Sequence, residues 1–283
     1  MIFFLSSLPR SGSTLLASLL NQRPDTYASN TSNLSEIMGA TISNWIGNDA
    51  TKASDSKYSE LTKVLKGMVD NRHPDHPVIF DKGRSWGSPA IIKTMLDVQE
   101  EVKIVTTVRP VAECLASFVK LIKPDNITDF CKRSKWSDHL FETYKAIKSG
   151  YEQYPDKFLF IEYDDLVFDP QIQLDRIAEF VGIDSFVYDF NNVKDSKEMD
   201  EVWEVKDLHK VRKKVSKRNY SGEFILGQSL WNFYQGGEFW NDKPEPKKKK
   251  LPINYQHDAL MAGDFEKSKR LAYKNLALYP EDS

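Results

Sequence analysis

The sequence predicts an α/β fold built on a mainly parallel β-sheet, and three observations support this class. Apolar, β-branched runs alternate along the chain with segments of helical periodicity, which is the pattern of βαβ units. The first apolar run leads directly into a loop of small residues and then a helix. The first strand is apolar throughout rather than alternating, as expected of a strand covered by helices on both faces.

Four strands are predicted in order from these runs. The first is residues 2–5, and the second, residues 77–80, continues into the polar segment 81–86. The third, residues 102–108, is β-branched almost throughout, which favours extended backbone. The fourth is residues 158–163, where Phe and Ile precede an acidic segment.

Three helices are predicted to follow the first, third and fourth strands. Leucines recur at helical spacing in residues 15–20, and five apolar residues share one helix face in residues 111–122. Pro110 is expected in the first turn of that second helix, where its missing N–H costs nothing. The third helix lies near residues 171–181 and ends at Gly182.

Composition changes near residue 241. Residues 1–241 are expected to form the main domain, residues 242–254 a linker rich in Lys and Pro, and residues 255–283 a C-terminal helical hairpin. The hairpin is similar to one unit of a tetratricopeptide repeat and would offer a contact for a protein partner. A single unit has no neighbours that bury its faces, which favours a helical pair packed on the main domain.

Charge and cysteine content exclude several classes of protein. Lys and Arg number 39 against 41 Asp and Glu, and the net charge of −2 argues against a protein that coats nucleic acid. No run of about 18 apolar residues is present to span a membrane, and the first residues lack the charged start of a signal peptide. The two cysteines are too few for a disulfide framework. We expect a cytoplasmic protein that binds neither nucleic acid nor membrane.

The strongest functional signal is the loop between the first strand and the first helix. Its sequence is Pro9-Arg10-Ser11-Gly12-Ser13-Thr14. The N-terminus of a helix offers unpaired N–H groups, and small residues let an anion approach them. The hydroxyls of Ser11, Ser13 and Thr14 add donors, and Arg10 adds a charged fork suited to phosphate. The loop lacks the Gly-Lys-Ser/Thr triplet of the ordinary P-loop, but it predicts a phosphate site.

The segment Leu8–Leu16 resembles the 5′-phosphosulfate loop of the sulfotransferase family. Its Pro-Arg-Ser-Gly form is similar to the bacterial-type and tyrosylprotein-type branches. The resemblance implies transfer of a sulfuryl group from 3′-phosphoadenosine 5′-phosphosulfate (PAPS) to a hydroxyl acceptor by in-line displacement, with 3′-phosphoadenosine 5′-phosphate (PAP) as the product. It also implies a three-layer fold like that of P-loop NTPases, no metal, and an acceptor among carbohydrates, small molecules and peptide tyrosines.

Further positions match motifs of the same family over about residues 1–240. Arg109 at a strand end, with Ser117 eight residues on in the next helix, matches the 3′-phosphate motif. Tyr163 matches an aromatic residue that contacts the adenine. Three basic residues fall where the family places a late loop over the 3′-phosphate, although a solvated charge run is the competing interpretation. They are Lys213, Lys214 and Arg218.

The resemblance also suggests roles in the chemistry. Arg10 and the loop N–H groups would bind the phosphate of the leaving group, and Lys82 would reach the transferred sulfonate or the bridging oxygen. Small-molecule members carry a catalytic His where this chain has Arg84, whose pKa is too high for a base.

The general base is left open between two carboxylates, Glu36 and Asp81. The competing interpretation, which the residues favour slightly, places Glu36 in the first turn of a helix capped by Asn33 or Ser35, where the helix dipole favours a carboxylate. Asp81 adjoins Lys82, and strand alternation would turn the two side chains to opposite faces.

Two other functions compete with sulfuryl transfer. One is a nucleotide kinase or other P-loop phosphotransferase, which the missing triplet and the Arg109–Ser117 pair oppose. The other is a non-catalytic nucleotide-binding module that uses the C-terminal hairpin for partners. Binding of PAP in preference to ATP would separate them.

Overall fold

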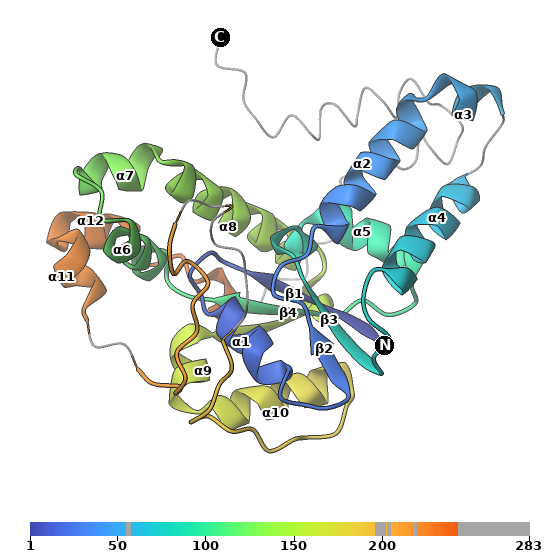
Figure 1. Ribbon diagram of the computed structural model, residues 1–283. Coiled ribbons are helices and arrows are strands. Elements are labelled where there is room, and N and C mark those ends of the chain that lie inside the picture. Colours follow the sequence, from blue (N-terminus) through green and yellow to red (C-terminus); the bar gives the residue numbers. More distant parts are fainter. Residues whose placement is uncertain (55–57, 196–201, 203–204, 218–219, 243–283) are drawn as a thin grey trace, which may run out of the picture. The chain divides into compact units, whose positions relative to one another are not determined.

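The computed structural model describes residues 1–54, 58–195, 202, 205–217 and 220–242 (Figure 1). The predicted hairpin at 255–283 and all but the first residue of the predicted linker lie outside these residues. The described chain forms two units. The first contains Met1–Ser32, Pro74–Leu96 and the chain from Glu101 onward, and the second contains Asn33–His73 and Asp97–Glu100.

A five-stranded parallel sheet forms the centre of the first unit. Its strands are β1 (Ile2–Ser7), β2 (Thr26–Ala28), β3 (Val78–Lys82), β4 (Ile104–Val108) and β5 (Phe158–Glu162). Their order is β2-β3-β1-β4-β5, and every neighbouring pair is parallel. Leu5 lies opposite both Lys82 and Val105, so the loop after β1 emerges at the same edge as the end of β3. The predicted α/β class and all four predicted strands are confirmed.

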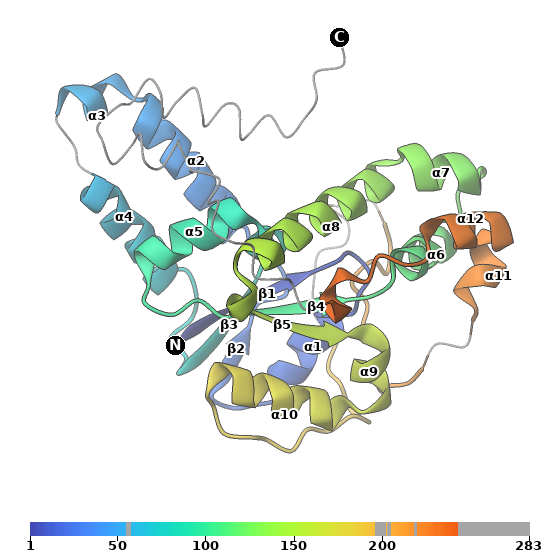
Figure 2. The same cartoon turned by 180° about the vertical axis from the view of Figure 1, so that it is seen from behind.

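Strand alternation sends side chains of β1 into two separate cores. Phe3 and Leu5 belong to an apolar cluster with α1 (Ser13–Leu20), α9 (Tyr163–Phe168) and α10 (Pro170–Val181). Phe4 points to the other face, where its ring lies 4.4 Å from the Trp86 ring of the short helix η1 (Arg84–Gly87). The helix α8 (Lys135–Gln153) covers that face (Figures 1 and 2). Helix, sheet and helix therefore form three layers, as the resemblance implied.

Of the remaining helices of the first unit, two lie between β4 and β5 along the chain and two follow β5. They are α6 (Val111–Ile122), α7 (Ile127–Arg133), α11 (Gly222–Leu226) and α12 (Gln228–Tyr234), with short 3-10 turns at Pro155–Lys157 and Phe239–Asn241. The helix α5 (Pro89–Val98) begins in the first unit and ends in the second. α10 ends at Gly182, whose φ of +79° confirms the predicted terminator. Pro110 was predicted in the first turn of the helix, but it is the N-cap of α6, which begins one residue later at Val111.

The second unit is helical, and only the start of its first helix, around Glu36, was predicted. It contains α2 (Leu34–Gly47), α3 (Asp49–Ala53) and α4 (Tyr58–Asn71). Leu61, Leu65 and Val69 form a buried stripe along α4 at intervals of four residues. Across both units, no helix in the described part of the chain is long and apolar enough to cross a membrane.

Candidate active site

The loop after β1 ends in an open helix N-terminus. α1 begins at Ser13, its N-cap is Gly12, and no side chain caps it. Gly12 has φ +91°, a conformation that glycine adopts readily. A Cβ atom at this position would also lie 2.7 Å from Cδ2 of Tyr163. Glycine is therefore required both for the turn and for the approach of the tyrosine, and the first N–H groups of α1 stay available to an anion.

Ser11 holds the loop to the sheet. Its buried Oγ lies 2.6 Å from the Leu8 carbonyl oxygen, 2.8 Å from the Thr107 carbonyl oxygen and 2.7 Å from Thr107 Oγ1. Its backbone N–H donates to the Leu8 carbonyl oxygen. The expectation that the Ser11 hydroxyl offers a donor to a bound anion is thus corrected: the hydroxyl is engaged at the end of β4. Ser13 and Thr14, in the first turn of α1, supply the other two hydroxyls.

The side chain of Arg10 extends toward α6 instead of staying at the loop. Its φ of +67° places the backbone in the left-handed region. Nε donates to Ser117 Oγ at 3.2 Å, and Nη1 donates to the carbonyl oxygen of Leu208. Arg10 was expected at the phosphate held by the loop, yet its guanidinium lies with Ser117, the residue expected at the other phosphate.

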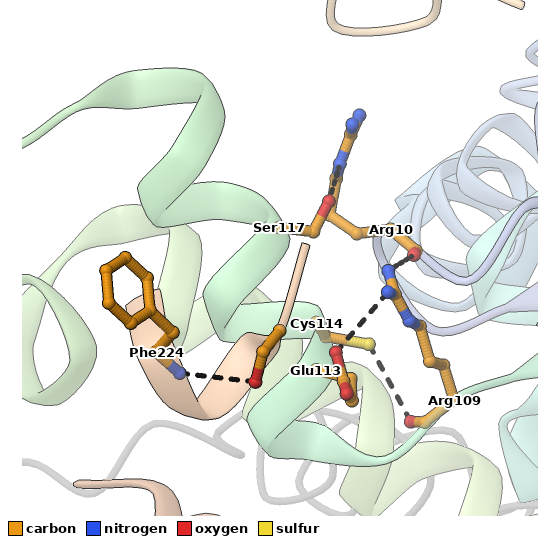
Figure 3. Close-up of polar contacts among 7 residues, drawn as sticks. Arg10, Arg109, Glu113, Cys114, Ser117 and Phe224 are labelled. Atoms are coloured by element: carbon orange, nitrogen blue, oxygen red, sulfur yellow. Dashed lines mark hydrogen bonds and ion pairs between the residues drawn. The ribbon is translucent and has the colours of Figure 1, made fainter. Parts of the chain in front are cut away.

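Arg109 joins the same cluster from the end of β4 (Figure 3). Its Nη1 donates to the Arg10 carbonyl oxygen at 3.2 Å, and its Nη2 forms a 3.4 Å ion pair with Glu113. Its Cζ lies 4.6 Å from the centre of the Tyr163 ring. The side chain is only 3% exposed, and Nε has no hydrogen-bond partner within the described residues. Arg10, Arg109 and Ser117 therefore form one cationic cluster rather than two separate sites.

Burial sets the electrostatics of this cluster. It lowers the pKa of Arg10, and the charge of Arg109 lowers it further. Burial also raises the pKa of Glu113, against the opposing effect of Arg109. An arginine nevertheless remains protonated near neutral pH because its ordinary pKa is above 12. The cluster thus carries two close positive charges and one carboxylate, which suits a ligand with more than one negative charge.

The end of β3 brings Lys82 to the loop. Lys82 Nζ donates to Thr14 Oγ1 at 3.2 Å, and its backbone N–H donates to Ser29 Oγ at 2.7 Å. Asp81 points to the opposite face, as strand alternation predicted. It is fully buried, and its two oxygens accept from Ser32 Oγ at 2.8 Å and Trp86 Nε1 at 2.7 Å. These contacts indicate a structural role for Asp81.

Other predicted site residues lie elsewhere or have weaker support. Glu36 is exposed in the first turn of α2 in the second unit, where Ser35 Oγ donates to its Oε2 at 2.9 Å. Asn33 is the N-cap of α2, but its side chain makes no capping hydrogen bond. Lys213 and Lys214 are exposed, and Arg218 lies outside the described residues.

Sequence reasoning missed several residues around the cationic cluster. The Leu208 carbonyl comes from a segment far along the chain, and the charge of Arg212 acts on the Tyr163 hydroxyl. Lys120 Nζ lies 3.8 Å from the centre of the Tyr220 ring. The basic character of residues 209–218 was a signal for Arg212, whereas nothing local in the sequence marks Leu208 or Tyr220. Among the described residues no group of His, Cys, Asp and Glu is arranged to hold a metal ion.

The parallel sheet, with a loop of small residues between β1 and α1, defines an α/β protein of P-loop-like architecture, and comparison with known proteins identifies its family. The model of the sulfotransferase family matches residues 3–187, and the chain belongs to this family. Nodulation protein H of Rhizobium tropici is 22% identical over 193 residues, which cover 64% of this chain and 75% of that protein.

Two solved structures of low sequence identity are also similar along most of the chain. The sulfotransferase domain of the Synechococcus PCC 7002 olefin synthase is 20% identical, with a TM-score of 0.43 and coverage of 96% of this chain and 94% of that chain. The sulfotransferase domain from the curacin biosynthetic pathway is 17% identical, with a TM-score of 0.47 and coverage of 98% and 97%.

Proposed function

We propose that this chain transfers the sulfuryl group of PAPS to a hydroxyl acceptor, with the cationic cluster as the site of the 3′-phosphate. The observation that carries the proposal is Arg109, a buried arginine whose Nε has no partner among the described residues. A buried charge with an unused donor is costly unless a ligand supplies an acceptor. Arg10 and Ser117 lie beside it, so a phosphate dianion would meet two guanidinium groups and a hydroxyl.

The loop and Lys82 fit the other end of the same nucleotide. The open N-terminus of α1, with the hydroxyls of Ser13 and Thr14, suits the 5′-phosphosulfate. Tyr163 packs on Gly12 and against Arg109, which suits the adenosine between the two ends. PAPS supplies an activated sulfuryl group whose leaving oxygen belongs to a phosphate. Lys82 and the loop N–H groups would stabilise the negative charge that develops on this oxygen.

Glu36 is the proposed proton acceptor for the hydroxyl nucleophile. The alternative, Asp81, is fully buried, and both of its oxygens accept hydrogen bonds from protein donors. Glu36 presents an exposed carboxylate. The variant Glu36→Gln should bind PAP like the wild type and lose sulfuryl transfer. Transfer at the wild-type rate in this variant would remove Glu36 from the mechanism.

The nucleotide assignment is tested by thermal unfolding with PAP and with ATP. A ligand at 100 times its Kd stabilises the folded state by about 2.7 kcal/mol, which raises the melting temperature. We expect a clear shift with PAP, little with ATP, and no PAP shift in Arg109→Ala. An equal or larger shift with ATP would favour a phosphotransferase instead. Transfer of labelled sulfate from PAPS to pools of carbohydrate, phenolic and peptide acceptors then distinguishes an enzyme from a nucleotide-binding module.

A further inference from the structure

Arg84 and His139 form a pair that the nucleotide site does not use. Arg84 begins η1, one residue after the end of β3, and His139 lies in the N-terminal half of α8. Arg84 Nη1 is 2.7 Å from His139 Nε2. Arginine can only donate, so His139 Nε2 accepts and its proton is on Nδ1. Burial, and then the charge of Arg84, lower the pKa of His139 to about 4. His139 is therefore neutral at pH 7, and it accepts a hydrogen bond from the guanidinium without adding a charge.

Tight packing between η1 and α8 holds this pair in place. A Cβ atom on Gly150 of α8 would lie 2.0 Å from the Gly87 carbonyl oxygen. A Cβ atom on Gly87 would lie 2.7 Å from Ile147. Ser6 Oγ, near the end of β1, donates to the Arg84 carbonyl oxygen at 3.0 Å. The position of the arginine is thus determined by backbone packing at the sheet edge.

The pair is connected to both parts of the nucleotide site. On one side, Arg84 follows two residues after Lys82, whose Nζ contacts Thr14 in the phosphate loop. On the other side, His139 lies one turn from Trp136, whose ring is 5.5 Å from the Phe118 ring. Arg10 Cζ is in turn 6.0 Å from the centre of the Phe118 ring. The pair therefore lies by the carboxyl ends of β1 and β3, the edge where parallel sheets bind their ligands.

We propose that Arg84 binds an oxyanionic group of the acceptor, a carboxylate or a sulfate or phosphate ester, and that His139 is its positioning residue. This inference rests on the proposed function, because it assigns the acceptor side of the same reaction centre. A guanidinium fork matches the geometry of these groups and keeps its charge at any physiological pH. A second cationic side chain two residues after Lys82 also favours an anionic acceptor approaching an anionic donor.

The binding step is tested on the PAP-saturated protein by NMR of 15N-labelled histidine, with the His139 signal assigned from its loss in His139→Gln. Sodium acetate and sodium methyl sulfate are titrated against sodium chloride at constant ionic strength. We expect a saturable shift of the His139 signal with an oxyanion, absent in Arg84→Gln. The two salts distinguish carboxylate from sulfate ester recognition. A wild-type signal that does not respond, or responds equally in Arg84→Gln, overturns the proposal.

Acceptor pairs with the same hydroxyl groups, one member a neutral methyl ester and the other the free carboxylate, test the consequence for turnover: methyl glucuronate with glucuronate, and methyl 4-hydroxybenzoate with 4-hydroxybenzoate. The anionic member of an accepted pair should have a kcat/KM at least about tenfold higher, which is the effect of one good charged contact. Arg84→Gln should abolish this preference through KM. If Arg84→Gln lowers kcat equally for both members, the charge of Arg84 acts on the transferred sulfuryl group and not on the acceptor. That result would overturn the proposal.

Two controls accompany these measurements. Variants of His139 distinguish a positioning role from a merely structural one, and the PAP-induced melting shift shows whether the proposed nucleotide site itself has failed. His139→Gln offers an amide oxygen to Arg84 and should retain most of the preference, whereas His139→Ala should raise KM for the anionic member only. A merely structural role would lower the melting temperature and affect both members alike. The PAP-induced melting shift should persist in Arg84→Gln, and its absence in the wild type would refute the nucleotide assignment instead.

Discussion

The buried histidine of α8 makes folding stability depend on pH in a calculable way. The pKa of His139 falls from its ordinary value of 6.5 to about 4 in the folded chain. The unfolded state therefore binds more protons between these values, and stability falls as pH decreases through this window. Proton linkage gives a loss of about 2 kcal/mol between pH 7.5 and pH 5 from this residue, and a maximum of about 3 kcal/mol at lower pH.

Urea unfolding of the wild type and His139→Gln at pH 7.5 and pH 5 measures this contribution. The free energy of unfolding of the variant should change by about 2 kcal/mol less than that of the wild type over the interval. His73→Gln makes the same chemical change in the second unit and serves as the matched control. Arg84→Gln should reduce the pH dependence only in part, because burial is the larger cause of the lowered pKa. An identical pH dependence in the wild type and His139→Gln would refute the reasoning.

Three further predictions concern the phosphate loop and the end of β3. Gly12→Ala combines a φ of +91° with a Cβ 2.7 Å from Tyr163 Cδ2, so the free energy of unfolding should fall by about 1–2 kcal/mol in urea and PAP affinity should fall in calorimetry. Lys82→Ala should lower kcat for sulfuryl transfer by about 100-fold or more while the Kd for PAP changes little, since its charge acts on the reacting group. Asp81→Asn disturbs the contacts to Ser32 and Trp86 and should cost about 1–3 kcal/mol of stability, with activity retained in the folded fraction. Complete loss of turnover in folded Asp81→Asn would return it to the mechanism.

The parts of the fold that sequence reasoning predicted are those with strong local patterns. Four strands are long apolar runs, and α6 and α10 have clear helical periodicity. β2 has only three residues, too few to form a pattern. In the second unit only the start of α2 was predicted. α4 was missed although it has a buried stripe, because most of its other positions are polar and no strand precedes it. Local periodicity is thus sufficient for elements that pack along their whole length.

Site geometry depended on contacts between distant residues. Gly12 and Arg109 follow strands, so the topology of a parallel sheet brings them to one edge. The direction of Arg10 depends instead on a positive φ and on the carbonyl of Leu208, 198 residues away. The hydrogen bond of His139 likewise depends on a distant residue, Arg84, which lies 55 residues earlier in the chain. Motif matching singled out the loop after β1, but tertiary packing determines where the side chain of each arginine lies.

The electrostatics of the cationic cluster suit the binding of an anion better than they suit stabilisation of the folded chain alone. Burial and the nearby charge of Arg109 both lower the pKa of Arg10, so the folded state disfavours the second positive charge. Glu113 pairs with Arg109 at 3.4 Å, and its own pKa is raised by burial, so it offsets the charge incompletely. A phosphate dianion at Arg109 Nε and Ser117 would supply the missing negative charge and the missing acceptor together. The cluster therefore stabilises the folded state only when an anion is bound. For this reason PAP should raise the free energy of unfolding of the wild type and leave that of Arg109→Ala unchanged.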